Sequence, residues 1–105
     1  MYLVETFKMT AAAREDPAFW QWMREFNQMC LKNNPYLKSI RAYITKVGDY
    51  SLDVWFEFSN YTDIEKSEKH EVHYLEDPKF KELFKKFFTY LEPVSRKILD
   101  DAPIP

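Results

Sequence analysis

The chain is poor in the residues on which several common kinds of site depend. It has one glycine and one cysteine among its 105 residues. A single glycine excludes the glycine-rich loops that hold nucleotide phosphates. A single cysteine, Cys30, excludes an internal disulfide and the zinc sites built from several cysteines, and it is consistent with a reducing compartment.

Long apolar runs and an excess of positive charge are also missing. No stretch approaches the roughly 18 apolar residues of a membrane-spanning helix, and Glu5 and Lys8 interrupt the apolar start where a signal peptide would need an unbroken run. The 15 basic residues are outnumbered by 17 acidic ones, so the chain lacks the cationic field that attracts nucleic acid or anionic lipid. We therefore expect a cytoplasmic protein that binds neither nucleic acid nor membranes.

Aromatic residues, in contrast, make up 18% of the chain, and many of them follow regular patterns. Residues 2–9 alternate loosely, which indicates a strand. Asp16 and Pro17 suit the first positions of a helix, and Asn33-Asn34-Pro35 would end it because proline disfavours helical geometry in the residue before it. One apolar face of this helix collects Phe19, Trp22, Met23, Phe26, Met29 and Cys30.

Residues 37–60 predict a β-hairpin that turns at Gly48 and Asp49. Side chains on successive strand residues point to opposite faces, so each strand has two sides. The apolar side carries Ile40, Ala42, Ile44, Leu52, Val54, Phe56 and Phe58. The other side is mixed and carries Arg41, Tyr43, Thr45, Ser51, Asp53, Trp55 and Glu57.

Two further helices and a last strand are expected in the remainder. Thr62 and Glu65 have the spacing of a capping box, which predicts a helix over 62–76. A second helix should follow Asp77-Pro78 and end before Pro93, with strand 94–100 after it. Its apolar stripe is Phe80, Leu83, Phe84, Phe87, Phe88 and Leu91.

The resulting order, β-α-β-β-α-α-β, predicts an α+β protein with a ferredoxin-like fold in a single domain over 1–105. Its four-stranded antiparallel sheet would have helices on one face only. The bare face would expose Tyr43 and Trp55, and an aromatic surface of this kind is normally covered. The economical cover is a second copy related by a two-fold axis, so we expect a homodimer or a higher oligomer.

In this element order, and in the stretch LDVWFEFSNYTDIEKSEKHEVHYLEDPKFKELFKKF (52–87), the chain resembles the dimeric α+β barrel proteins. This group contains the antibiotic-biosynthesis-type monooxygenases, and the carrying features are a strand near Trp55, a helix with His73, an Asp-Pro step and an aromatic helix. The resemblance implies oxygenation or rearrangement of an aromatic or quinol-like substrate in a cavity, without a bound cofactor in the monooxygenases. Other relatives degrade haem, but the first strand here lacks the asparagine of that group.

The stretch HEVHYLEDP (70–78) contains both histidines of the chain. On a helical wheel His70, His73 and Asp77 share a face, opposite Ile64, Val72 and Leu75. That face has three interpretations: a solvated surface, an acid-base or pocket-rim site, or a two-histidine metal site. The solvated interpretation is favoured because a metal site needs three or four converging ligands, and no third one is fixed here. We expect no metal and no cofactor.

The mixed face of the hairpin has two interpretations. In the structural one, Arg41 pairs with Asp53 or Glu57 across the strands and holds an interface together. In the functional one, this face lines a small cavity, because binding pockets combine apolar walls with a few polar groups.

In the functional interpretation Trp55 and Tyr43 are the walls and Arg41 orients the ligand. Asp53 or Glu57, together with His73, would move protons. The function that we expect is binding of a small planar or aromatic molecule in a sheet-lined cavity, with cofactor-independent oxygenation as its catalytic form. The alternative is a non-catalytic assembly protein whose dimer interface is filled.

Overall fold

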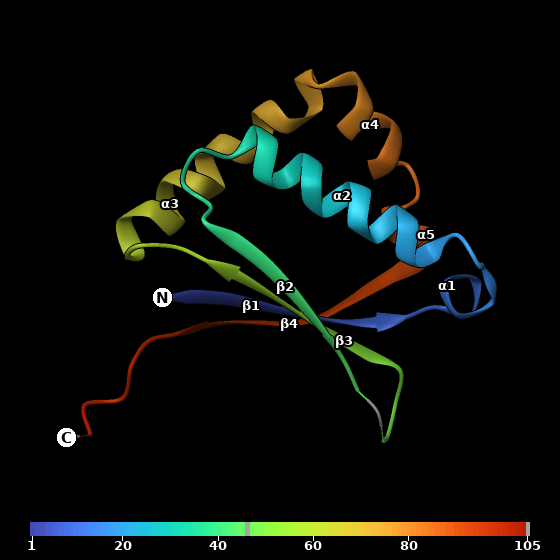
Figure 1. The fold of residues 1–105 in the computed structure, drawn as a ribbon, viewed down its shortest axis with the longest axis horizontal. Helices are drawn as coiled ribbons and strands as arrows, with labels where there is room; N and C mark the ends of the chain where they lie inside the picture. Colours follow the sequence, from blue (N-terminus) through green and yellow to red (C-terminus); the bar gives the residue numbers. More distant parts are fainter. Residues whose placement is uncertain (46, 105) are drawn as a thin grey trace.

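The structure, a computed structural model, describes residues 1–45 and 47–104. Its four-stranded antiparallel sheet has the order β2-β3-β1-β4, and the long helices lie on one face of it (Figure 1). The strands are β1 (Tyr2–Met9), β2 (Ser39–Ile44), β3 (Ser51–Glu57) and β4 (Leu91–Leu99). The helices are α1 (Ala11–Glu15), α2 (Phe19–Asn33), α3 (Tyr61–His70), the 3-10 helix η1 (Glu71–Glu76), α4 (Pro78–Phe84) and α5 (Phe87–Tyr90). The predicted ferredoxin-like α+β fold is confirmed.

The predicted hairpin is also confirmed, and it separates the two faces of the sheet as expected. Leu52 and Val54 of β3 are buried against the helices. Ala42 and Ile44, on the same side of β2, are exposed, and the end of the hairpin extends beyond the helical layer (Figure 1). The turn contains Gly48 with a φ of 121°, a conformation that other residues rarely adopt.

The start of α2 differs from the prediction. Asp16 and Pro17 do not begin this helix; they follow a short helix, α1, that the sequence pattern did not predict. Thr10 caps α1 by accepting a hydrogen bond from the Ala13 N–H, at 3.2 Å. Asp16 accepts hydrogen bonds from the Ala18 N–H and from the Tyr90 hydroxyl, so it joins the α1–α2 turn to α5. The predicted apolar face of α2 is confirmed: Phe19, Trp22, Met23, Met29 and Cys30 are buried and Phe26 packs against the core.

The predicted helix over 62–76 divides into two elements. Asn60, and not Thr62, caps α3 by accepting a hydrogen bond from the Asp63 N–H, at 2.9 Å. After His70 the chain tightens into the 3-10 helix η1, which has about three residues per turn. A wheel drawn at 3.6 residues per turn therefore fails beyond this point: Val72 is 70% exposed, whereas Tyr74 is buried.

The last predicted helix and strand are displaced as well. The helix after Asp77 ends at Phe84, a second short helix ends at Tyr90, and β4 begins at Leu91. Pro93 therefore lies inside β4, where it pairs with Phe7. Proline is tolerated there because β4 is an edge strand. A β-bulge follows, since Phe7 pairs with Pro93 but Thr6 pairs with Ser95, which leaves Val94 without a partner.

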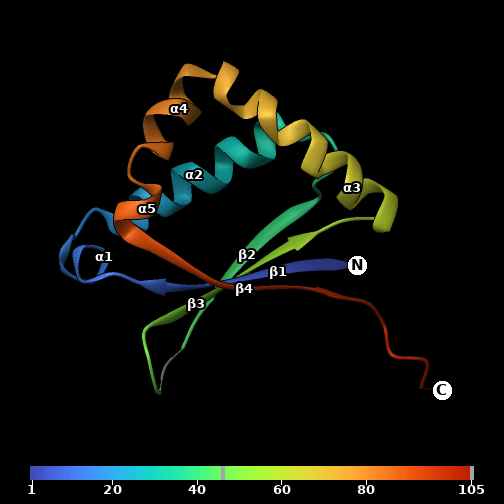
Figure 2. The same ribbon diagram turned by 180° about the vertical axis from the view of Figure 1, so that it is seen from behind.

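The second face of the sheet, which we call the outer face, carries no helix (Figure 2). The molecule measures 44 × 38 × 18 Å, and its radius of gyration is 14.4 Å. A compact chain of this length has a radius of gyration of about 13 Å. The protein is thus a flat structure of two layers, helices and sheet, and the outer face of the sheet is left uncovered. Among the described residues, none of the helices combines the length and apolarity that a membrane crossing needs.

Candidate functional site

A cavity of about 280 Å³ lies between the sheet and the helices; we call it the cleft. The sheet contributes side chains from β1, β3 and β4, and the opposite wall comes from α2, α3, η1, α4 and α5. Its walls are mainly apolar and include the aromatic residues Phe26, Phe56, Tyr74, Phe80, Phe84 and Phe87. Leu75 and Phe84 line the cleft but are 50% and 36% exposed, so they lie at its mouth.

The cleft exists because the helical layer is not pressed onto the whole sheet. The indole N–H of Trp22 donates to the Leu83 carbonyl at 2.9 Å, which fixes α2 against the end of α4. At the other end, Asn34 donates hydrogen bonds to the Ser67 and Tyr74 hydroxyls, at 2.7 and 2.6 Å. These contacts tie the helices to one another at both ends of α2, and the aromatic side chains between them line the space that is left.

Glu5 is the one acidic residue of β1, and it lies among the apolar side chains of the cleft wall. Its neighbours on the same side of β1 are Leu3 and Phe7, which are both buried. Across the sheet it pairs with Val54 on one side and Arg96 on the other. The predicted site residues did not include Glu5. The sequence does contain a sign of it: Glu5 points to the same face of β1 as Leu3, Phe7 and Met9, so it interrupts an otherwise apolar series.

Burial raises the pKa of Glu5 above its usual value; the nearby Arg96 opposes this and Glu68 adds to it. The guanidinium of Arg96 forms an ion pair with Glu68, and its Nε lies 3.8 Å from Oε1 of Glu5. Glu71 also lines the cleft, and its pKa is raised by partial burial and by the charge of Glu5. The cleft therefore presents two carboxyl groups, Glu5 and Glu71, whose pKa values are both raised.

Cys30 and Tyr74 line the same cleft but hold their protons. Burial, with smaller effects of Glu71 and Glu5, raises the pKa of Cys30 to about 12. Burial is also the main cause of the raised pKa of Tyr74, whose hydroxyl accepts the hydrogen bond from Asn34. At neutral pH the thiol is protonated, which makes it a poor nucleophile.

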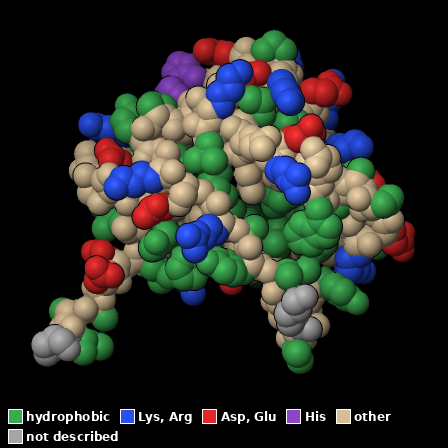
Figure 3. All heavy atoms as spheres, in the orientation of Figure 1, with side chains coloured by type: hydrophobic (Ala, Val, Ile, Leu, Met, Phe, Trp, Pro, Cys, Tyr) green, Lys and Arg blue, Asp and Glu red, His purple; other side chains and the backbone are tan. Residues whose placement is uncertain are grey.

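The two histidines lie on the surface of the helical layer (Figure 3). They line a second hollow together with Lys32, Asn33, Glu76, Asp77 and Pro78. His70 Nε2 donates to the Asn33 carbonyl at 2.6 Å, and His73 Nδ1 lies 2.9 Å from Oε1 of Glu76. In the part of the chain that the structure describes, no three histidine, cysteine or carboxylate side chains come together as a metal site would require.

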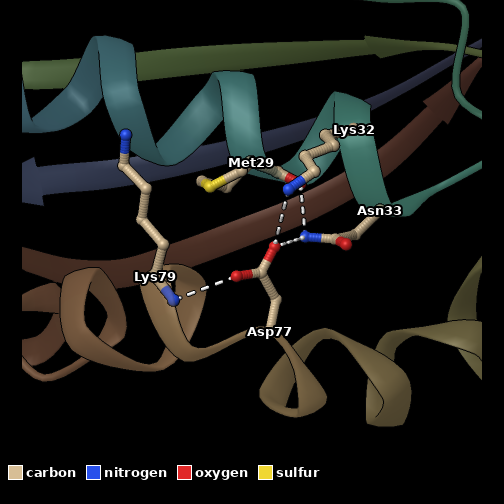
Figure 4. A network of polar contacts seen from close by, with 5 residues as sticks. All are labelled: Met29, Lys32, Asn33, Asp77 and Lys79. Carbon is tan, nitrogen blue, oxygen red and sulfur yellow. Dashed lines mark hydrogen bonds and ion pairs between the residues drawn. The ribbon is translucent and has the colours of Figure 1, made fainter.

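Asp77 acts as a joint between two helices (Figure 4). Its Oδ1 accepts from the Lys79 N–H at 2.9 Å, which caps α4. Its Oδ2 accepts from Asn33 Nδ2 at 3.0 Å and lies 3.5 Å from Lys32 Nζ, both on α2. The hydrogen bond from Asn33 is the main cause that lowers the pKa of Asp77. These contacts give Asp77 a structural role.

The structure brings five of the six predicted site residues together on the outer face. Trp55 lies between Tyr2 and Tyr43, with ring centroids 5.3 and 5.8 Å apart. Arg41 is on the same face, directly opposite Trp55.

The two acids of that face have local partners. Asp53 accepts from the Thr6 hydroxyl at 2.7 Å and Glu57 from the Ser39 hydroxyl at 2.9 Å. No ion pair within 4.0 Å joins Arg41 to either acid among the described residues, so the expected cross-strand pair does not form. His73, the sixth predicted residue, lies on the opposite layer, away from both acids.

Comparison with known proteins identifies the fold alone. No family model and no curated protein matches the sequence. A nipsnap family protein with unknown function from Agrobacterium tumefaciens matches with a TM-score of 0.71 at 17% identity, over 96% of this chain and 86% of that one.

An uncharacterised NIPSNAP domain protein from Burkholderia xenovorans gives a TM-score of 0.61 at 15% identity, over 100% of this chain and 99% of the other. A provisionally assigned antibiotic biosynthesis monooxygenase from Nitrosomonas europaea gives 0.55 at 10% identity, over 92% of both chains. The chain thus has the α+β fold of these proteins, and the likeness to the antibiotic-biosynthesis-type monooxygenases is the one that the sequence predicts.

Proposed function

We propose that this protein binds a small, planar, largely apolar molecule in the cleft between its sheet and its helices. The observation that carries this proposal is the aromatic-walled cavity of about 280 Å³. A ligand that covers apolar wall surface removes it from water, which favours binding by about 25 cal/mol per Å². Aromatic walls favour flat ligands, because rings stack face to face or edge to face.

The volume sets the size of the ligand. A buried apolar cavity of roughly 150 Å³ admits benzene. The cleft, at about 280 Å³, is therefore suited to a molecule of one or two fused rings. Leu75 and Phe84 at the mouth offer an entry route that does not require the core to open.

The outer face supports a second part of the proposal, that the protein is a homodimer. Tyr2, Tyr43 and Trp55 form an aromatic cluster there, and Tyr43 is 50% exposed. A second copy placed face to face would bury this cluster from both sides. In this arrangement Arg41, Asp53 and Glu57 contribute the polar part of the interface.

The outer face also supports an alternative location for the ligand. If the two sheets enclose a space, Trp55 and Tyr43 are its walls, Arg41 orients the ligand, and Asp53 or Glu57 acts as base. The close packing of Trp55 between two tyrosines is the observation that favours it. A third possibility, a non-catalytic assembly protein, requires both spaces to be unused.

A pair of neighbouring substitutions on α2 tests the main proposal. Asn27 lines the cleft, whereas Gln28 is exposed on the same helix. Isothermal titration calorimetry with 2-naphthol should show binding to the wild type and to Gln28→Trp. Asn27→Trp, which fills the cleft, should abolish it.

Binding that survives Asn27→Trp would contradict the proposal. If that binding is instead lost in Trp55→Ala, the ligand occupies the outer face. Absence of binding to any form would favour the assembly protein. Cofactor-free oxygenation is tested separately, by dioxygen uptake with a bound quinol.

A further inference from the structure

The carboxylate of Glu5 has no hydrogen-bond partner among the described residues. Its closest charged neighbour, Arg96 Nε, lies 3.8 Å away, which is too long for a hydrogen bond. The side chain is 31% exposed, so its oxygens are not sealed in the core. A carboxylate that lines an apolar cavity, and whose one ion pair is this long contact with Arg96, keeps its oxygens available as hydrogen-bond acceptors for a ligand.

The other polar groups near Glu5 are already engaged or protonated. Arg96 on β4 is held by Glu68 on α3. The Tyr74 hydroxyl accepts from Asn34, and the Cys30 thiol on α2 keeps its proton. Apart from Glu71 on η1, the charged and titratable groups that face Glu5 thus have partners or no charge.

The charges around the cleft are therefore unbalanced. Glu5, Glu68 and Glu71 contribute three carboxyl groups against the single guanidinium of Arg96, and that guanidinium is closest to Glu68. An anionic ligand would have to approach two carboxyl groups in a partly desolvated space, where like charges repel strongly. A hydroxyl group would instead donate to Glu5 and form a charge-assisted hydrogen bond.

We infer that the cleft selects a planar ligand whose polar group is a hydrogen-bond donor of the phenol type, that Glu5 accepts this hydrogen bond, and that anions are excluded. This inference rests on the proposed function. It names Glu5, on β1, as the residue that orients the ligand. The sequence pattern gave that role to Arg41 on the outer face. No covalent step is involved.

Three naphthalene probes of one shape test the inference on the wild-type protein: 2-naphthol, 2-methoxynaphthalene and naphthalene-2-sulfonate. The first donates a hydrogen bond, the second cannot, and the third stays anionic. We expect 2-naphthol to bind about tenfold more tightly than the methoxy compound, since a hydrogen bond to a charged group has that value. The sulfonate should bind more weakly than both.

Glu5→Gln should reverse the preference. The neutral amide accepts a weaker hydrogen bond, so 2-naphthol binding should fall by about five- to tenfold. Sulfonate binding should rise several-fold, because one like charge is gone. Glu76→Gln is the matched control, since Glu76 lies on η1 with Glu71 but outside the cleft and should change neither affinity.

A pH series gives a second measurement, made on the wild type and compared with Glu5→Gln. Sulfonate binding to the wild type should strengthen as the pH falls and Glu5 takes up a proton, and this trend should be weaker in Glu5→Gln. Equal affinity for the three probes in the wild type, or an unchanged order in Glu5→Gln, overturns the inference while leaving the cleft as a binding site. If no probe binds and Asn27→Trp changes nothing, it is the proposed function that fails.

Discussion

Asn34 ties the helical layer together, and its replacement by alanine should be strongly destabilising. The residue is only 2% exposed. Its side chain donates to Ser67 and Tyr74 and accepts from the Tyr36 N–H at 3.1 Å. Alanine would leave these three groups without their partner.

The expected loss can be worked out from these contacts. Each buried polar group that loses its partner costs about 1–3 kcal/mol. Ser67 and Tyr74 are buried, whereas Tyr36 is half-buried and can regain a water molecule. We therefore expect Asn34→Ala to lower the free energy of unfolding by about 3 kcal/mol, which corresponds to roughly 15 °C in the melting temperature of a domain this size.

Urea denaturation followed by circular dichroism measures this loss, and Asn33→Ala is the matched control. Asn33 is also an asparagine at the end of α2, and its amide donates to the Met29 carbonyl and to Asp77, both at 3.0 Å. It is only half-buried, so water can replace those contacts, and we expect a loss of about 1 kcal/mol. If Asn34→Ala costs no more than Asn33→Ala, the reasoning from buried, unpaired groups is refuted.

Three further predictions concern the cleft and the outer face. The pKa of Glu5 is raised in the fold, so the stability that its protonation contributes is complete below the ordinary pKa and is lost as the pH rises through the raised pKa. Glu5→Gln should therefore be more stable than the wild type near pH 7, by less than about 1 kcal/mol after solvent screening. The urea midpoints of the two forms should converge as the pH falls. Cys30, buried with a pKa raised to about 12, should react with a disulfide reagent only as fast as the protein opens, so that its labelling rate follows the urea concentration; rapid labelling in the native state would contradict this. Trp55→Glu should convert a dimer into a monomer in sedimentation velocity experiments, whereas Val72→Glu, on the exposed side of η1, should leave the dimer intact; a wild type that sediments as a monomer would refute the outer-face interface.

The parts of the fold that were predicted correctly are those with one regular period. The apolar face of α2 holds for fifteen residues because the helix keeps its period throughout. The hairpin holds because its strands alternate cleanly on both sides of Gly48. The predictions fail where the period changes, as it does at His70, where α3 becomes a 3-10 helix and moves Tyr74 into the core instead of Val72.

The candidate site was harder to predict than the fold, and for a physical reason. The sequence identifies which side chains share a face, but it does not show how far the helices stand from the sheet. That distance depends on tertiary contacts such as the bond between Trp22 and Leu83. The predicted residues Arg41, Tyr43 and Trp55 do share the outer face, whereas the cleft with Glu5 became evident only when the spacing of the layers was known.

The unpaired Val94 determines which residue of β4 meets Glu5. If Val94 took its place in the ladder opposite Thr6, strict alternation would continue from Pro93, Ser95 would stand opposite Glu5, and Arg96 would turn away from the helices. Lys97 would then stand opposite Leu3, with its ammonium group against the apolar wall. A one-residue change of parity in an edge strand thus decides whether Glu5 of the cleft wall stands opposite a guanidinium or opposite a hydroxyl group.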